Sequence, residues 1–80
     1  MYNNIKGFNK DFKKTICKNI KKFRKEKEIR LMDLAEILEV SPEYLKRIES
    51  PNDDKKTCSL TLLYKLSLIF DKKIDDFFKE

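Results

Sequence analysis

The sequence predicts an all-α fold: one compact body of five helices with short connections. Only one glycine and two prolines interrupt the eighty residues, so few positions favour turns. No segment alternates apolar and polar residues as a half-buried strand does. Apolar residues instead recur at spacings of three and four, which is the repeat of an amphipathic helix. A chain of this length forms a single domain with a modest core.

The first helix is expected over residues 10–27, with Asn9 as its N-cap. Its apolar stripe consists of Phe12, Ile16, Ile20 and Phe23. Spacings of four, four and three place these side chains on one face, and lysines occupy the other faces. Residues 1–9 form an N-terminal extension that either packs loosely or stays mobile, and residues 10–80 form the folded domain.

The next two helices are expected over residues 31–38 and from Pro42 to about Ser50. Ser41 should cap the second of them by accepting a hydrogen bond from a free backbone N–H. Pro42 fits the first helical position, where its missing donor costs nothing, and Pro51 stops the helix. Two short helices joined by a tight turn form a helix-turn-helix, whose second helix can enter the major groove of DNA.

Two further helices follow a polar loop over residues 51–58. Ser59 should cap the fourth helix, whose expected buried stripe is Leu60, Leu63, Leu66 and Phe70. The short fifth helix should turn Ile74 and Phe77 inward. Its first turn contains Asp75 and Asp76, where negative charge is favourable.

Charge is distributed unevenly along the chain. Residues 1–30 contain eleven Lys or Arg and three Asp or Glu, a net charge of +8, whereas residues 31–80 contain eight and eleven, a net charge of −3. The positive part suits a polyanion, whose condensed counterions are released when a protein binds it. The alternative is a lysine-rich helix face that is merely solvated.

Composition also excludes several classes of function. The chain has no histidine, and it has no glycine-rich phosphate loop and no nucleophile beside a plausible base. We therefore expect no enzymatic activity, cofactor, bound metal or small-molecule substrate. Cys17 is expected to be buried and inert, and the exposure of Cys58 stays open. Two cysteines and the lack of an apolar run long enough to span a bilayer predict a cytoplasmic protein without a membrane partner.

From about Ile16 to Phe78 the sequence resembles the Cro/CI-type (XRE) helix-turn-helix family of phage repressors. The resemblance rests on KNIKKFRKEK, LAEILEVSPEYLKRIES, SLTLLYKLSLIF and IDDFF, in that order. It implies a lambda-repressor-like fold and a sequence-specific DNA-binding regulator, a repressor or controller that binds an operator on double-stranded DNA.

The resemblance also implies roles for individual residues. The DNA-contacting positions are Arg30, Leu31, Ser41, Pro42, Glu43, Tyr44, Lys46, Arg47, Lys55 and Lys56. Arg47 presents a fork of donors that matches guanine; alternatively, it pairs with Glu43 one turn earlier. Tyr44 either binds a phosphate or simply packs. Arg24 and Glu49 match positions that form a structural ion pair.

Some positions depart from the family pattern. Arg30 and Leu31 stand where the family has a hydroxyl cap followed by glutamine, so Arg30 is expected to act as a clamp on the DNA backbone. Glu39 and Asp71 stand at positions where the family has glycine. The left-handed backbone expected there strains a glutamate, whereas an aspartate tolerates it better.

An apolar cluster near the C-terminus predicts a homodimer. Its residues are Leu68, Ile69, Ile74, Phe77 and Phe78, and a symmetric contact would match a pseudo-palindromic operator. The alternative is that the last helix only caps the core. A second function stays open as well: Leu31, the acidic loop and the additional apolar residues also suit a helix-turn-helix that binds a protein, as an anti-repressor or antitoxin-like partner does.

Overall fold

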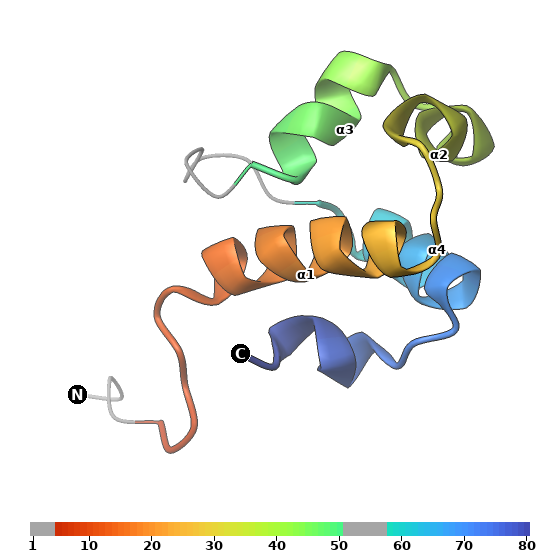
Figure 1. The fold of residues 1–80 in the computed structure, drawn as a ribbon. Coiled ribbons are helices and arrows are strands. Elements are labelled where there is room, and N and C mark those ends of the chain that lie inside the picture. Colours follow the sequence, from red (N-terminus) through yellow and green to blue (C-terminus); the bar gives the residue numbers. More distant parts are fainter. Residues whose placement is uncertain (1–4, 51–57) are drawn as a thin grey trace.

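The computed structural model describes residues 5–50 and 58–80, which form four α-helices and one short 3₁₀ helix (Figure 1). The elements are α1 (Phe12–Glu26), α2 (Leu31–Leu38), α3 (Pro42–Ile48), α4 (Leu60–Phe70) and the 3₁₀ helix η1 (Ile74–Phe78). None of these described residues belongs to a strand, which confirms the all-α class. The predicted count of five helices is not confirmed, because the last element is a single 3₁₀ segment.

Helix α1 runs through the middle of the fold, and the other elements surround it. Helix α4 and η1 pack against α1, whereas α2 packs against α3. In Figure 1 the α2–α3 pair lies on one side of α1 and η1 lies on the opposite side. Phe23 of α1 meets Phe77 of η1 edge-to-face, with ring centroids 5.2 Å apart, and contacts Phe70 of α4 in the same way at 6.2 Å.

The start of α1 differs from the prediction. Asn9 does not cap the helix; the cap position belongs to Asp11, whose side chain makes no capping hydrogen bond. Asn9 instead forms a local turn, in which its Oδ1 accepts from the Asp11 N–H and its Nδ2 donates to Thr15 Oγ1. In the N-terminal extension, the Phe8 ring lies 6.1 Å from that of Phe12, and residues 1–4 lie outside the described part.

The predicted serine caps of α3 and α4 are confirmed. Ser41 Oγ accepts from the Tyr44 N–H at 3.1 Å, and Ser59 Oγ accepts from the Leu62 N–H at 3.1 Å. The left-handed conformation predicted after α2 and α4 is present at Glu39, with φ 59°, and at Asp71, with φ 55°. Both side chains are exposed.

Helix α4 buries a different face from the one predicted. Leu63, Leu66 and Phe70 are buried as expected, but Leu60 is 74% exposed and Leu62 is buried in its place. The buried face is wider than a single stripe and extends towards Leu62. Leu60 is the first residue of the helix, and it shares the outer face with Tyr64 and Leu68, which follow at intervals of four residues.

Asn19 attaches the C-terminal segment to α1. Its buried side-chain amide donates hydrogen bonds to the carbonyl oxygens of Phe77 and Lys79, both at 2.8 Å, and a longer one to that of Asp76 at 3.4 Å. Carbonyl groups at a helix end lack partners within the helix, so this amide satisfies the end of η1. It also holds Phe77, which has no exposed surface, in the core.

Candidate nucleic-acid interface

Helix α3 is buried on one face and exposed to solvent on the other. Leu45 and Ile48 are fully buried, whereas Glu43, Lys46 and Arg47 are exposed. A turn of three residues, 39–41, joins it to α2. The two short helices and the tight turn between them are therefore present as predicted, with the outer face of α3 accessible.

Arg47 is not bound to Glu43. Within the described part of the chain, the ion pairs do not include these two residues, although they lie one turn apart on the same exposed face. The alternative role expected for Arg47, a surface pair with Glu43, is therefore absent from this structure. Tyr44 is 37% exposed, so part of its ring is covered and part is accessible.

Arg30 stands at the start of α2 and binds an acidic neighbour. Its Nε donates to Asp33 Oδ2 at 2.8 Å and its Nη2 donates to Asp33 Oδ1 at 3.4 Å. The hydrogen bond to Asp33 raises the pKa of the Arg30 guanidinium. A phosphate at this position would compete with the carboxylate, which weakens the predicted clamp.

Two of the predicted contact positions differ from expectation in their surroundings. Leu31 is half-buried and packs against the core, so little of its side chain is available to a sugar or a thymine methyl. The exposed apolar residue at the start of α2 is Met32. Lys55 and Lys56 fall in residues 51–57, outside the part of the chain that the structure describes.

The ion pair between Arg24 and Glu49 is present and ties α1 to the end of α3. Arg24 Nε donates to Glu49 Oε2 at 2.7 Å, and Nη2 donates to Oε1 at 3.1 Å. The third donor, Nη1, reaches the Ile29 carbonyl at 2.9 Å, just before α2. Because the two side chains are only 12% and 5% exposed, this bidentate pair fixes where α3 sits relative to α1.

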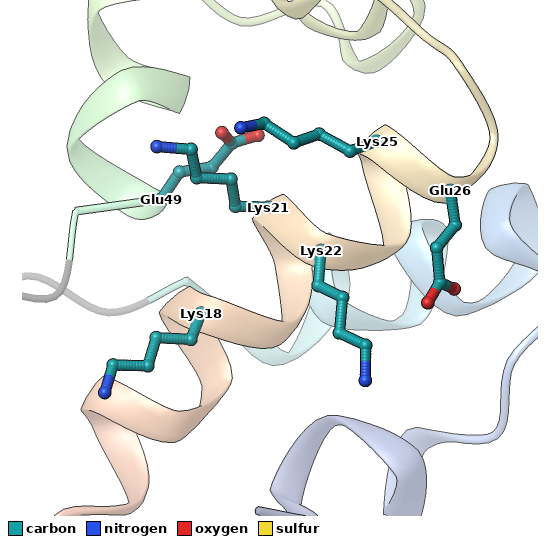
Figure 2. A pocket seen from close by; sticks show the side chains of 6 residues that line it. All are labelled: Lys18, Lys21, Lys22, Lys25, Glu26 and Glu49. Carbon is teal, nitrogen blue, oxygen red and sulfur yellow. The ribbon is translucent and has the colours of Figure 1, made fainter.

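The sequence associated the basic first half of the chain with a polyanion, but it named none of the lysines of α1 as a site residue. Lys18, Lys21, Lys22 and Lys25 line an open surface hollow beside the end of α3, together with Glu26 and Glu49 (Figure 2). Their spacing along the sequence could have indicated a common face. What it could not indicate was that the face borders α3.

The residues of the predicted dimer contact do not form one surface. Leu68 is 64% exposed and Phe78 is 44% exposed, whereas Ile69 and Ile74 are half-buried against the core. Phe77 is fully buried, because Asn19 holds its backbone and Phe23 packs on its ring. Its assignment to the dimer contact is therefore wrong: in this fold it has no surface to offer a second copy.

Other kinds of site find little support among residues 5–50 and 58–80. This part of the chain contains no cluster of three potential metal ligands, and none of its helices is long and apolar enough to cross a membrane. Cys17 is buried as expected. Burial raises the pKa of the Cys58 thiol, which keeps it protonated and poorly nucleophilic at neutral pH.

Neither protein-family models nor curated protein sequences match this chain.

Proposed function

We propose that this protein is a sequence-specific DNA-binding regulator of lambda-repressor-like architecture, which occupies an operator through α3. The observation that supports this most is the exposed guanidinium of Arg47, which forms no ion pair with the described residues and lies on the outer face of a helix whose inner face is buried. The major groove admits an α-helix, and a forked donor on such a helix discriminates guanine from the other bases. In this proposal the protein acts as a repressor or controller by blocking access to the operator.

Binding selection from a random-sequence duplex library tests this proposal. We expect a preferred site to be enriched at moderate salt. Arg47→Ala should weaken binding to that site by about 5- to 150-fold, which corresponds to about 1–3 kcal/mol of discrimination. Lys65→Ala, which removes an exposed charge from α4, is the matched control. Failure to enrich any site, together with no loss in Arg47→Ala, would contradict the proposal.

The proposal includes a homodimer, which would match two half-sites of an operator. Its support is now confined to the exposed residues of the C-terminal cluster, Leu68 and Phe78, with Leu60 and Tyr64 on the same face of α4 as Leu68. Sedimentation equilibrium at micromolar concentration should detect a dimer, and Leu68→Glu should dissociate it. A monomer under these conditions, both alone and with DNA, would remove this part of the proposal.

A protein-binding role is the second candidate, as in an anti-repressor or antitoxin-like partner. Met32 and Ile37 are largely exposed on α2, and Arg30 is already bound to Asp33. Exposed apolar residues on one element can contribute to a protein contact. Recovery of one stoichiometric protein partner, lost in Met32→Glu and accompanied by undetectable DNA binding, would favour this function over the first.

A further inference from the structure

The lysines that line the hollow on α1 have no acidic partner. Within the described chain, none of Lys18, Lys21, Lys22 and Lys25 takes part in an ion pair. The two carboxylates of the hollow are committed elsewhere: Glu49 to Arg24, and Glu26 to Lys72 at 3.9 Å. Among the described residues that line it, the hollow therefore presents four ammonium groups and two carboxylates that pair with other cations, an excess of positive charge.

This arrangement carries an electrostatic cost within α1. The lysines are spaced by three and four residues, which makes them neighbours on the helix surface. Like charges at these spacings destabilise a helix. An external polyanion would relieve the repulsion further, because none of these lysines forms an ion pair with an acidic residue of the described chain.

The lysine face continues onto α3. Figure 2 shows the side chains of Lys21 and Lys25 extending from α1 towards Glu49, which directly follows α3. Lys46 precedes Glu49 by three residues, so it lies on the same side of α3 one turn earlier, and it is exposed. Lys18, Lys21, Lys25 and Lys46 thus form one basic strip, which begins on α1 and reaches the helix proposed to read the bases.

We propose that this basic strip binds the phosphate backbone of duplex DNA outside the base pairs that α3 contacts, which rests on the proposed function of α3. Lysine ammonium groups bind phosphates as point charges, and contacts of this type set register and affinity without reading sequence. A membrane surface fits less well, because the residues that line the hollow are all charged. Interfacial helices carry Trp, Phe or Leu beside their basic residues.

The salt dependence of binding to a random-sequence duplex measures how many phosphates the basic strip neutralises. Each phosphate that a protein neutralises contributes about 0.9 to the slope of log affinity against log salt. The variant Lys18→Gln/Lys21→Gln/Lys25→Gln should reduce the slope by about 2.7 and weaken binding at least tenfold at 0.1 M salt. The variant should lose the same factor in affinity for the preferred site and for a scrambled duplex. All three side chains are exposed, so the urea unfolding midpoint should not fall.

A control variant removes the same charge from other surfaces. Lys10→Gln/Lys65→Gln/Lys73→Gln replaces three exposed lysines that lie outside the hollow. If this control reduces the slope as much as the strip variant does, general charge explains binding and the proposal is overturned. An unchanged slope in the strip variant overturns it as well.

The outcomes also separate this proposal from that for α3. If Arg47→Ala leaves site preference unaltered while the strip variant still lowers the salt slope, the strip binds DNA and the base-reading role of α3 fails. If Arg47→Ala removes the preference while the strip variant keeps its slope, only the strip proposal fails. Binding to phosphatidylserine vesicles that matches DNA binding, and that the strip variant abolishes, would assign the strip to a membrane and overturn it.

Discussion

Replacing Glu49 with glutamine should destabilise the fold strongly, because it leaves the Arg24 guanidinium buried without its counter-charge. Glu49 accepts two hydrogen bonds from Arg24, at 2.7 and 3.1 Å, and its side chain is 5% exposed. Removing one partner of a buried pair costs about 3–5 kcal/mol. The Arg24 side chain retains slight contact with solvent, so we expect about 3 kcal/mol. A domain of this length has a total stability of roughly 4–12 kcal/mol.

Urea unfolding, followed by circular dichroism, measures this loss. With a urea dependence of about 1 kcal/mol per molar for a small domain, the midpoint should fall by about 3 M. Asp33→Asn is the matched control, because it breaks a bidentate pair with Arg30 in which the side chains are 84% and 45% exposed. Exposed pairs contribute at most about 1 kcal/mol, so its midpoint should move far less.

A double-mutant cycle separates the charge pair from packing. Arg24→Met/Glu49→Met removes both charges together, and an apolar replacement of a buried pair is often nearly neutral. The double variant should therefore be more stable than Glu49→Gln. The reasoning is refuted if Glu49→Gln and Asp33→Asn lose similar stability. It is also refuted if the double variant loses as much stability as Arg24→Met and Glu49→Met lose together.

Three other changes test the remaining structural conclusions. Asn19→Ala should lower stability by about 1–3 kcal/mol, because it leaves buried carbonyls at the end of η1 without a donor; a loss below 0.5 kcal/mol in urea, on the order of error, would contradict this role. Glu39→Gly should raise the free energy of unfolding by up to about 1 kcal/mol, because glycine adopts a left-handed backbone without a Cβ clash; a lower free energy of unfolding would show that this φ is not strained. Hydrogen bonds from the Lys79 side chain and the Lys73 N–H lower the pKa of Asp76 below its ordinary 3.8. Its contribution is therefore present at neutral pH and lost as pH falls through the folded pKa, so Asp76→Asn should reduce the stability difference between pH 7 and pH 3, and an unaltered difference would contradict this assignment.

Local chemistry made the helix boundaries predictable. Ser41 and Ser59 each precede an apolar run, and a serine hydroxyl at that point satisfies a backbone N–H that the helix cannot. The left-handed turn at Glu39 was predicted only through the family resemblance. The N-cap of α1 was mistaken because Asn9 and Asp11 are both good caps, and the turn that Asn9 makes with Thr15 leaves no trace in a residue pattern.

Periodicity predicted which side of α1 is buried, because an amphipathic helix packs its apolar face against the core. It failed on α4, where most residues are apolar and only Thr61 and Lys65 mark the exposed side, so Leu60 and Leu62 were exchanged. The lysine spacing likewise defined a face of α1 without its neighbour. That Lys21 and Lys25 border α3, that Asn19 bonds to carbonyl groups almost sixty residues away and that Phe77 is enclosed are results of chain packing. Such contacts depend on which distant segments of the chain pack together. The local structural preferences of neighbouring residues do not specify this packing.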